Sequence, residues 1–589
     1  MSLSAGCSTW AEFPPHVLRE YALIADGRRG ALCGPRGDLV WLCVPRWDAP
    51  AVLSALIGGE GVFAVTPAES CVWGGYYEPG TLIWRHRWTT PTTRVECRDA
   101  LALPADEHRA IVLRRIEAIE HDVTVRVVLD VGAEFGQCRM REVRREDNGV
   151  WSARSGGIRV RLHGAPGARI ESGRLTAEIT VPAGRRHDLV LELSEHELPA
   201  APRPDVLWRE TEGGWRTATQ AIGQQVSNRD ARHAYTVLHG LTTPGGGMVA
   251  AATLGLPERA EQGRNYDYRY VWLRDQIYAG LAAAVDQPLP LFDDAVGVVV
   301  ARLLEHGPDL APAYRVDGTP LPEESVLDLP GYPGGTVVVG NWINAQFQLD
   351  TVGEILQILG MAAGLGRLDT DGHKAMELAV GIIEERWTKP DAGIWELDKA
   401  WWTHSRLACV AGLTTAAASA PPTRAGRLTS LAEGILAETT RMCLHPTGRW
   451  QRSPDQTAVD AALVLPPVRG ALPAGDERTI RTLRAVEQDL LADGYVYRFA
   501  PSDRPLGEDE GAFLLCGFMM ALAHWQQGHH VDANRFFERT RAACGPPGLY
   551  AEEYDVQQRQ LRGNLPEAFV HALLLETAQR LQAGSAQRR

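Results

Sequence analysis

The chain has 589 residues, of which 45% are hydrophobic, and this is enough to form two hydrophobic cores rather than one. Its 73 aspartates and glutamates outnumber its 60 lysines and arginines, so its formal net charge is −13. A surface of that sign repels phosphate backbones, and nucleic acid is therefore not an expected partner. The apolar runs are far shorter than the roughly 20 residues that span a bilayer, so no membrane contact is expected either.

Ten cysteines, among them Cys7, Cys33 and Cys409, are scattered along the chain without a Cys-x-x-Cys pair. This distribution favours reduced thiols over disulfides or a zinc site. The first ten residues lack a basic flank followed by an apolar stretch, so we expect no secretory signal and a cytoplasmic protein. Glycines 245–247 are better interpreted as a turn than as a cofactor site, and we expect no cofactor and no metal.

β-strands are predicted within residues 1–205. Apolar and polar residues alternate over 123–129, 158–162 and 175–181, which is the period of a strand with one buried face. Turn-forming sequences such as 147–149 lie between these segments. Half-buried antiparallel strands in this number predict a β-sandwich.

Helices are predicted after that part. Residues 206–230 are expected to form a linker that becomes helical, and 231–589 to form the second domain. Apolar residues recur there at helical spacing, for example over 355–363 and 514–522. Successive helices without strands between them predict stacked helical hairpins, which either close into a toroid or remain an open solenoid. The periodicity alone does not distinguish these two arrangements.

Two stretches place a carboxylate beside an aromatic ring. They are residues 391–396, which contain Trp395 and Glu396, and residues 551–555, which contain Glu552. A carboxyl group against an indole is partly desolvated, so its pKa is raised toward neutrality. One carboxyl group kept as an acid and another left as a base are the minimum needed to cleave a glycosidic bond, and the rings offer a sugar an apolar face.

A third motif, residues 265–275, contains four aromatic residues and ends in Leu273-Arg274-Asp275. One interpretation is a helix start with aromatic core packing and a surface ion pair. The other is a sugar clamp, in which Asp275 accepts hydrogen bonds from hydroxyl groups and Arg274 donates to them.

At this motif the sequence resembles a known family. Tyr-Val-Trp-Leu-Arg-Asp, residues 270–275, resembles the first signature of glycoside hydrolase family 15, which holds glucoamylases, glucodextranases and a branch of bacterial trehalases. Residues 391–396, followed by 402–405, resemble the general-acid segment of that family, and 551–555 resemble its general-base segment. Residues 21–54 resemble the amino-terminal trehalase-like domain of bacterial members. The ordered blocks cover most of the chain.

The resemblance implies a β-sandwich followed by an (α/α)6 barrel, and inversion at the anomeric carbon. It makes Glu396 the general acid and Glu552 the general base, whereas Arg274 and Asp275 grip the glucosyl unit. The residues expected to bind the substrate are Tyr268, Trp272, Arg274, Asp275, Trp395, Trp402, Glu553, Tyr554 and Glu567.

Physical arguments accompany these roles. Glu396 follows Trp395 and lies near Trp387 in sequence, so we expect a raised pKa and a proton donor; the alternative is a solvated carboxylate. Two adjacent glutamates are usually a solvated pair, but the order of the motif favours Glu552 over Glu553 as the base. Inversion predicts carboxyl groups about 6.5–9.5 Å apart, with room for one water molecule.

Some positions depart from the family pattern. Thr414 and Thr415 stand in a stretch where relatives carry an acidic and a basic residue, and Glu567 stands where relatives commonly carry glutamine. These changes leave the acid, the base and the clamp in place, but they bear on which group leaves. Our hypothesis is that Glu567 and Trp401 line the outer, leaving-group side of the site.

The function predicted from the sequence is an inverting exo-acting α-glucoside hydrolase that releases glucose from the non-reducing end, with trehalose as the favoured substrate. Within the class, the alternatives are a glucoamylase-type or an isomalto-oligosaccharide α-glucosidase. More distant alternatives are a glycoside phosphorylase and a non-catalytic sugar-binding protein. The oligomeric state stays open, and a homo-oligomer is compatible with the sequence.

Overall fold

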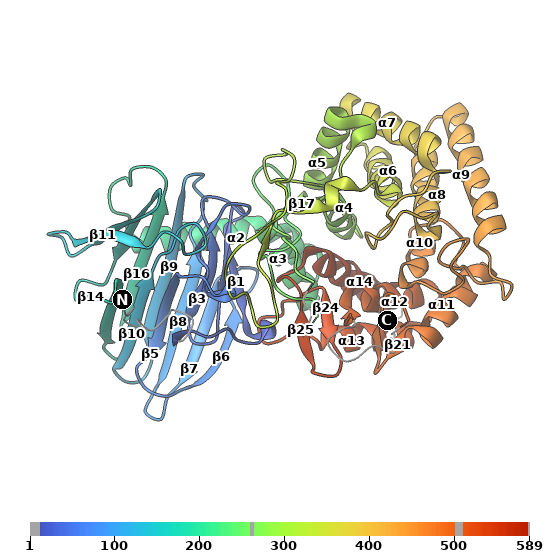
Figure 1. Cartoon of the computed structure of the whole chain (residues 1–589). Helices are drawn as coiled ribbons and strands as arrows, with labels where there is room; N and C mark the ends of the chain where they lie inside the picture. Colours follow the sequence, from blue (N-terminus) through green and yellow to red (C-terminus); the bar gives the residue numbers. More distant parts are fainter. Residues whose placement is uncertain (1–11, 260–263, 501–509, 587–589) are drawn as a thin grey trace.

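The computed structural model describes residues 12–259, 264–500 and 510–586. These residues form an amino-terminal part made of strands and a carboxy-terminal part made of helices, side by side (Figure 1). Cys7 lies outside the described residues, and the nine cysteines within them are free thiols.

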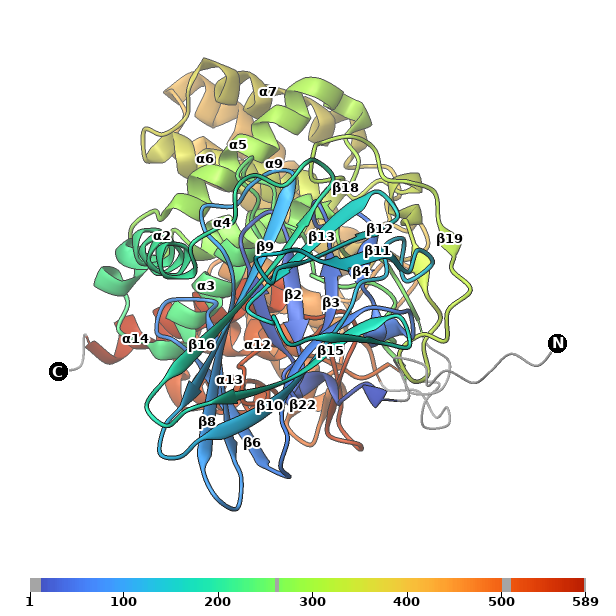
Figure 2. The same ribbon diagram turned by 90° about the vertical axis from the view of Figure 1, so that its left-hand side faces the viewer.

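Two eight-stranded antiparallel sheets make up the amino-terminal part, which faces the viewer in Figure 2. The first sheet consists of β1 (Ala22–Ala25), β2 (Gly30–Cys33), β3 (Asp38–Cys43), β4 (Ala51–Leu53), β5 (Val62–Pro67), β10 (Val123–Asp130), β15 (Arg174–Val181) and β14 (Arg169–Glu171). The second consists of β11 (Met140–Arg145), β12 (Trp151–Ser155), β13 (Ile158–His163), β16 (Arg186–Ser194), β9 (Arg109–Ala118), β8 (Arg94–Leu101), β7 (Trp84–Thr89) and β6 (Val72–Tyr77).

The predicted strands are confirmed as β10, β13 and β15. Along β10, Val123, Val125 and Val127 are buried, whereas Arg126 between them is exposed. The buried valines belong to one apolar cluster that also contains Val112 of the opposite sheet. The period of two therefore produces the expected sandwich, with the core between its sheets.

Helix α2 (Pro204–Gln225) occupies most of the predicted helical linker. It packs against the second sheet through two hydrogen bonds. The Trp208 indole N–H donates to Asp188 Oδ1 of β16 at 3.1 Å, and the Thr219 hydroxyl donates to Gly80 O, between β6 and β7, at 2.9 Å. Arg98 and Arg115 both stack over the ring of Trp208. The segment is thus a helix held along the sandwich. The domain boundaries at 205/206 and 230/231 stay a prediction.

The helices of the carboxy-terminal part are α3 (Arg229–Leu241), α4 (Leu273–Ala282), α5 (Pro290–His306), α6 (Leu349–Gly364), α7 (Thr370–Arg386), α8 (Thr403–Ala418), α9 (Pro422–Cys443), α10 (Leu465–Val468), α11 (Glu477–Asp489), α12 (Leu514–Gln526), α13 (His530–Arg541) and α14 (Ala568–Ala586). The helical periodicity found over 355–363 and 514–522 is confirmed by α6 and α12.

Six of these helices contact one another in a closed inner ring across the described residues, in the order α4, α6, α8, α10, α12, α14 and back to α4. Each has an outer partner: α5, α7, α9 and α13 pack on the helix that precedes them, α3 packs on α14, and α11 packs on the 3-10 turn Ala461–Val464 that leads into α10. The inner helices α6 and α12 are buried on nearly every side, whereas the outer helix α11 buries one face. A helix that is buried on every side needs neighbours on every side, and the closed ring with its outer partners supplies them.

The sandwich supports the segment that leads into α4. Arg269 is fully buried and donates to Ala49 O of the sandwich at 2.6 Å, and it also pairs with Asp267 at 2.8 Å. The Trp41 indole N–H, from β3, donates to Ala252 O at 2.8 Å. The residues before α4 are therefore held by both parts of the chain.

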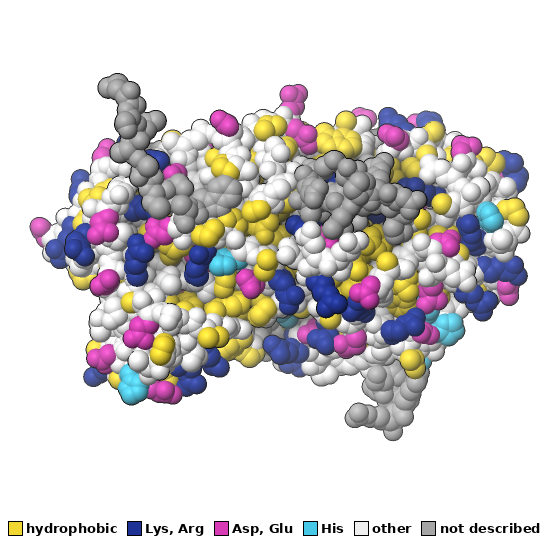
Figure 3. Space-filling view, turned by 60° about the horizontal axis from the view of Figure 1, so that its bottom comes forward, with side chains coloured by type: hydrophobic (Ala, Val, Ile, Leu, Met, Phe, Trp, Pro, Cys, Tyr) yellow, Lys and Arg dark blue, Asp and Glu magenta, His cyan; other side chains and the backbone are white. Residues whose placement is uncertain are grey.

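No described helix is long and apolar enough to cross a membrane. Basic and acidic side chains are interspersed on the face drawn in Figure 3. The basic side chains therefore do not gather into a separate patch on that face.

Replacing Arg269 with methionine should destabilise the protein strongly. The change would leave the Asp267 carboxylate buried without its cation, and breaking a buried ion pair in this way costs about 3–5 kcal/mol. Chemical denaturation measures this cost. The matched control is Arg427→Met, since Arg427 pairs with Glu384 on the surface. Equal losses in the two variants would contradict the supporting role of Arg269.

Candidate active site

One cavity of about 700 Å³, open to solvent, lies at the end of the ring where the inner helices begin. Its walls come from the residues before or at the start of α4, α12 and α14, and from the loops before α6 and α8. Eight of the predicted site residues line it: Tyr268, Trp272, Arg274, Asp275, Trp395, Glu396, Glu552 and Glu567. The structure thus brings together residues from three distant stretches of sequence.

Glu396 stands on a tight turn that Asp391 organises. The buried Asp391 carboxylate accepts hydrogen bonds from the Gly393 N–H and the Ser405 hydroxyl, both at 2.8 Å, and pairs with Arg406. Glu396 itself has a φ of 57°, in the left-handed region that non-glycine residues rarely adopt. Its side chain is 24% exposed, in the cavity. The backbone of this turn is therefore strained in order to direct the carboxyl group into the cavity.

The surroundings of Glu396 differ from the apolar indole setting that its sequence neighbours predict. Its Oε1 accepts a hydrogen bond from the Trp272 indole N–H at 3.1 Å and lies 3.2 Å from Arg274 Nη1. The indole N–H of Trp395 instead donates to Asp460 Oδ1 at 2.7 Å. Both partners of the Glu396 carboxyl group thus belong to the 265–275 motif. The sequence around Glu396 could not indicate these contacts, because they join segments far apart in the chain.

Glu552 lies just before β24 (Glu553–Asp555), which pairs with β23 (Ala512–Phe513). Its carbonyl accepts from the Leu514 N–H at 3.0 Å, and its Oε2 accepts from the Tyr268 hydroxyl at 3.1 Å. Loss of hydration inside the protein raises the pKa of Glu552 to about 7; Arg498 lowers it and the charge of Glu396 raises it. Glu552 is therefore a group that gains or loses a proton near neutrality.

Tyr268 and Trp272 connect the two glutamates. The Tyr268 hydroxyl contacts Glu552 and the Trp272 indole contacts Glu396, and the two ring centroids are 5.5 Å apart. Trp272 lies in the short strand β17 (Val271–Trp272), which pairs with β18 (Ala313–Tyr314) and fixes the backbone between the two rings and α4. A single segment thus holds both carboxyl groups at the cavity. The separation that inversion requires stays a prediction.

The clamp expected from Arg274 and Asp275 lies in the same cavity. Asp275 is 1% exposed, and burial raises its pKa to about 6 against the opposing charge of Arg274. Asp275 Oδ2 lies 3.6 Å from Arg274 Nε, and it accepts no hydrogen bond from the described residues. Asp275 lines the cavity, and a hydrogen bond from a sugar hydroxyl group to its carboxylate stays a prediction.

Glu567 lies beside this clamp. It immediately precedes α14, and its Oε2 accepts from the Val570 N–H at 2.6 Å. Glu567 is 3% exposed, and burial followed by the charge of Asp275 raises its pKa well above the usual range. Glu567 therefore lines the cavity with the charge of Asp275 nearby, and its place on the outer, leaving-group side stays a prediction.

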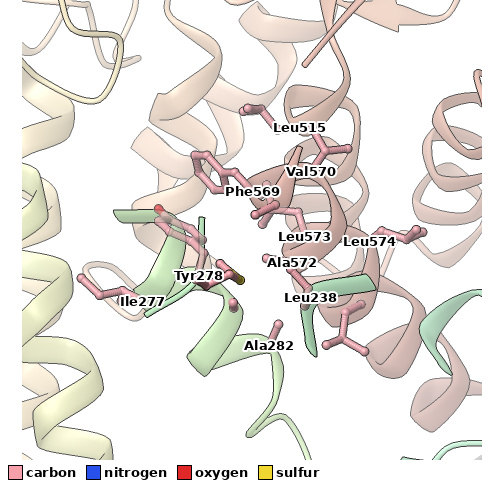
Figure 4. Packing of buried hydrophobic residues seen from close by; sticks show 14 of the residues in the cluster. Leu238, Ile277, Tyr278, Ala282, Leu515, Phe569, Val570, Ala572, Leu573 and Leu574 are labelled. Carbon is pink, nitrogen blue, oxygen red and sulfur yellow. The ribbon is translucent and has the colours of Figure 1, made fainter. Parts of the chain in front are cut away.

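The same stretch carries Phe569, which lines the cavity and packs on Tyr278 with ring centroids 4.4 Å apart (Figure 4). Leu515 of α12 also lines the cavity and lies near these residues in the packed interior. The floor of the cavity is therefore continuous with the core of the ring.

Three predicted site residues are not part of the cavity lining. Trp402 packs against Gly393 and lies under the guanidinium of Arg452. Glu553 is fully buried, and its Oε2 accepts from the Gly511 N–H at 2.7 Å. The Tyr554 ring packs on Tyr495, with centroids 4.6 Å apart. These positions hold the walls from behind, so they do not fit the sugar contact that we expected for Trp402, Glu553 and Tyr554.

The departures from the family pattern fall in different places. Thr414 and Thr415 lie on α8, where their hydroxyl groups donate to the carbonyls of Val410 and Ala411 in the preceding turn. Neither threonine lines the cavity. Trp401 does not line it either, and instead stacks with Arg406 at 4.4 Å.

Sequence reasoning missed several residues that line the cavity. They are Ala250, Glu258, Arg264, Tyr266, Asn341, Trp342, Ile394, Arg498, Phe513, Leu515 and Phe569. Trp342 is 44% exposed and follows Asn341 in the loop before α6, and an aromatic ring left in solvent beside a cavity is a common sign of sugar binding. Tyr266 is one of the four aromatic residues of the 265–275 motif, and that motif was the signal for it. Glu258 comes shortly before the motif, and nothing in its immediate sequence marks it.

Two groups of side chains in the described part of the chain have the composition of a metal site, and neither is in this cavity. The first is Cys33, His86 and Asp99 in the core of the sandwich. Two indole N–H groups donate to His86 Nδ1, and Arg114 pairs with Asp99. A metal on His86 Nε2 would require a hydrogen on Nδ1, facing those two donors, so this arrangement does not suit an ion. The second group is His524, His529 and Asp532, at the opposite end of α12.

Comparison with known proteins agrees with this geometry. The sequence profile described as Glycosyl hydrolases family 15 matches residues 231–579, and the profile described as Trehalase-like, N-terminal matches residues 12–198. The trehalase of Mycolicibacterium smegmatis is 28% identical over 632 residues, which cover 97% of this chain and 92% of that protein. The trehalase of Mycobacterium tuberculosis is 29% identical over 628 residues, with 98% and 91% covered.

Among solved structures, a bacterial glucoamylase in complex with acarbose superposes with a TM-score of 0.74, covering 99% of this chain and 96% of that chain. At 15% identity this likeness concerns the fold alone. Together with the paired glutamates in the cavity, the fold and the sequence relatives define a glycoside hydrolase. The chain belongs to glycosyl hydrolases family 15.

The positive φ of Glu396 predicts that glycine there is more stabilising than alanine, which is the reverse of their usual order in a helix. Glu396→Gly should be more stable than Glu396→Ala by about 1 kcal/mol, because glycine adopts positive φ without a Cβ clash. Glu377, exposed within α7, is the control: there the glycine variant should be the less stable one, by about 1 kcal/mol. Chemical denaturation of the four variants checks this, and the same order at both positions would contradict the strain.

Proposed function

We propose that this protein hydrolyses trehalose with inversion at the anomeric carbon, releasing glucose. The observation that carries the proposal is the cavity in which Tyr268 and Trp272 hold Glu552 and Glu396 beside the Arg274–Asp275 clamp. Trehalase is also the name of the full-length relatives from two mycobacteria.

In the proposed reaction the clamp holds the glucosyl unit, with Asp275 accepting from a hydroxyl group and Arg274 donating to one. Glu396 gives a proton to the glycosidic oxygen as the bond to the anomeric carbon breaks. Glu552 takes a proton from the water molecule that attacks the opposite face of that carbon. The negative charge of Glu552 also stabilises the positive charge that develops on the sugar ring.

The leaving sugar would lie toward the rim of the cavity. Trp342 and Tyr266 line that cavity and are not buried, and Arg264 stacks over Tyr266 with its guanidinium 5.6 Å from the ring centroid. Aromatic faces of this kind suit the apolar face of a hexose. A glucoamylase-type or isomalto-oligosaccharide α-glucosidase would use the same catalytic pair, so glucose release from a panel of α-linked disaccharides distinguishes these substrates.

The remaining parts of the proposal concern the setting of the protein. The cysteines in the described residues are free, and most are buried, which supports a reducing compartment such as the cytoplasm. The excess of acidic residues supports a small neutral sugar, rather than nucleic acid, as the partner. A homo-oligomer stays a prediction, for which sedimentation measurements are the test.

The two glutamates should fail in different ways. Glu396→Gln should lose about 10²–10⁴-fold of the rate on trehalose, because its leaving group needs a proton, and should lose much less on α-glucosyl fluoride, whose fluoride leaves without one. Glu552→Gln should lose activity on both substrates, because the water molecule has no base. Initial rates in phosphate-free buffer measure this.

Glu377→Gln is the matched control, since this exposed glutamate of α7 is outside the cavity. Turnover that requires added phosphate would indicate a phosphorylase instead. A wild-type protein that binds sugars and cleaves none would indicate a non-catalytic sugar-binding protein. Full trehalose activity in both glutamine variants would remove Glu396 and Glu552 from the chemistry.

The pH dependence follows from the raised pKa of Glu552, which is about 7. Below that pH the carboxyl group is protonated and cannot accept a proton from water, so kcat/KM should fall as the pH decreases through about 7. A profile of kcat/KM between pH 5 and 9 checks this. A value that stays constant down to pH 5 would contradict the assignment of Glu552 as the base.

A further inference from the structure

Glu258 brings a second carboxyl group to the hydroxyl of Tyr268. That hydroxyl lies 3.1 Å from Glu552 Oε2 and 3.3 Å from Glu258 Oε1. A phenol has one hydrogen, so it can donate to only one of the two oxygens. The other contact is favourable only when that second carboxyl group is itself protonated and donates to the phenol oxygen.

The backbone keeps Glu258 beside Glu552. A Cβ atom placed on Gly563 would lie 3.6 Å from Glu258 Cγ and 3.7 Å from Glu552 Cβ, so this glycine lies beside both side chains. The Gly563 N–H donates to Pro257 O at 2.9 Å, and this bond fixes the backbone next to Glu258. Glu258 is 4% exposed and lines the cavity. The carboxyl group therefore has few directions other than toward Tyr268.

The arginines near Glu258 are directed at another carboxylate. Arg264 lies 3.7 Å from Glu258 Oε2, but only 2.7 Å from Glu510. Arg498 pairs with Glu510 through two nitrogens, and Arg259 lies 3.6 Å from it. The ionisable groups that face Glu258 are thus Tyr266, Tyr268, Arg264, Arg498, Glu510, Glu552 and Glu553.

Electrostatics indicate which of the two glutamates keeps the proton. Burial, followed by the charge of Glu552, raises the pKa of Glu258 to about 8, whereas that of Glu552 is raised to about 7. A proton shared by the pair therefore resides mainly on Glu258.

We propose that Glu258 is a positioning residue that stays protonated in the working enzyme and donates to the Tyr268 oxygen, so that the Tyr268 hydroxyl donates to Glu552. This arrangement leaves Glu552 ionised, with its orientation fixed for the attacking water molecule. When Glu258 loses its proton at higher pH, the Tyr268 hydrogen has two carboxylates to serve and the orientation of Glu552 is lost. The inference rests on the proposed role of Glu552 as the base.

Two substitutions test this inference. Glu258→Gln keeps an N–H donor for the Tyr268 oxygen, so its kcat/KM on trehalose at pH 7 should stay within about 3-fold of wild type. Glu258→Leu removes the donor and leaves the buried Tyr268 oxygen without it, and should lose about 10–100-fold, which is the usual cost of a buried polar atom left without its partner. Circular dichroism and the thermal midpoint show whether each variant is folded, and Glu377→Gln again serves as the control.

The pH profile separates this role from a purely structural one. In wild type, kcat/KM should fall again above about pH 8, as Glu258 ionises. In Glu258→Gln, which has no proton to lose, this alkaline limb should be absent or shifted upward by about one pH unit or more. An unchanged alkaline limb in Glu258→Gln, or equal losses in the glutamine and leucine variants, would overturn the proposal.

A readout that needs no turnover keeps the test independent of the proposed function. In protein labelled with ¹³C at the glutamate carboxyl groups, the signal that disappears in Glu258→Gln should have the chemical shift of a carboxylic acid at pH 7. If the wild type cleaves no α-glucoside, the proposed function fails while this measurement still tests Glu258. A Glu258 signal that is already ionised at pH 6 would overturn the proposal even in an active enzyme.

Discussion

The hydroxyl of Tyr268 and the indole N–H of Trp272 contact the two carboxyl groups on which the proposed chemistry depends. Their rings lie on one short segment and contact each other, so the position of Glu552 relative to Glu396 is set by side chains four residues apart. The two glutamates are 156 residues apart in the chain, and they come from different loops around the ring. Without this segment, two separate loops would have to place the acid and the base independently.

The sandwich supports the segment that carries Tyr268 and Trp272. Arg269 lies between Tyr268 and Trp272, and its guanidinium is bonded to Asp267 and to the carbonyl of Ala49 in the sandwich. Trp41 holds the preceding loop at Ala252. The strand-rich part thus supports the backbone that carries both aromatic rings, although none of the residues described between 12 and 249 lines the cavity.

Much of the fold could be predicted from the sequence, because periodicity is a local property. The alternation of Val123, Val125 and Val127 specifies a strand with one buried face, and the apolar spacing over 355–363 specifies a helix. Closure of the ring could not be predicted from periodicity, since it depends on α14 meeting α4, nearly 300 residues earlier in the chain. That expectation came from the family resemblance instead.

For the candidate site too, local sequence patterns predicted some residues but not the contacts between distant segments. The motifs placed Glu396, Glu552 and the clamp in one cavity, but adjacency in sequence was misleading for Glu553 and Tyr554, because Glu553 is held by the Gly511 N–H and the Tyr554 ring packs on Tyr495, away from the cavity lining. Contacts between distant segments were inaccessible. The Arg274 partner of Glu396 and the closeness of Glu258 to Glu552 arise only in the folded chain.

Inversion is the claim that most directly tests whether Glu396 and Glu552 act as an acid and a base on opposite faces of one sugar. ¹H NMR of the first products from α,α-trehalose, recorded before mutarotation, measures it. Inversion converts one half of each molecule to β-glucose while the leaving half remains α-glucose, so the account predicts equal initial amounts of the two anomers. Initial formation of α-glucose alone would show retention and contradict it.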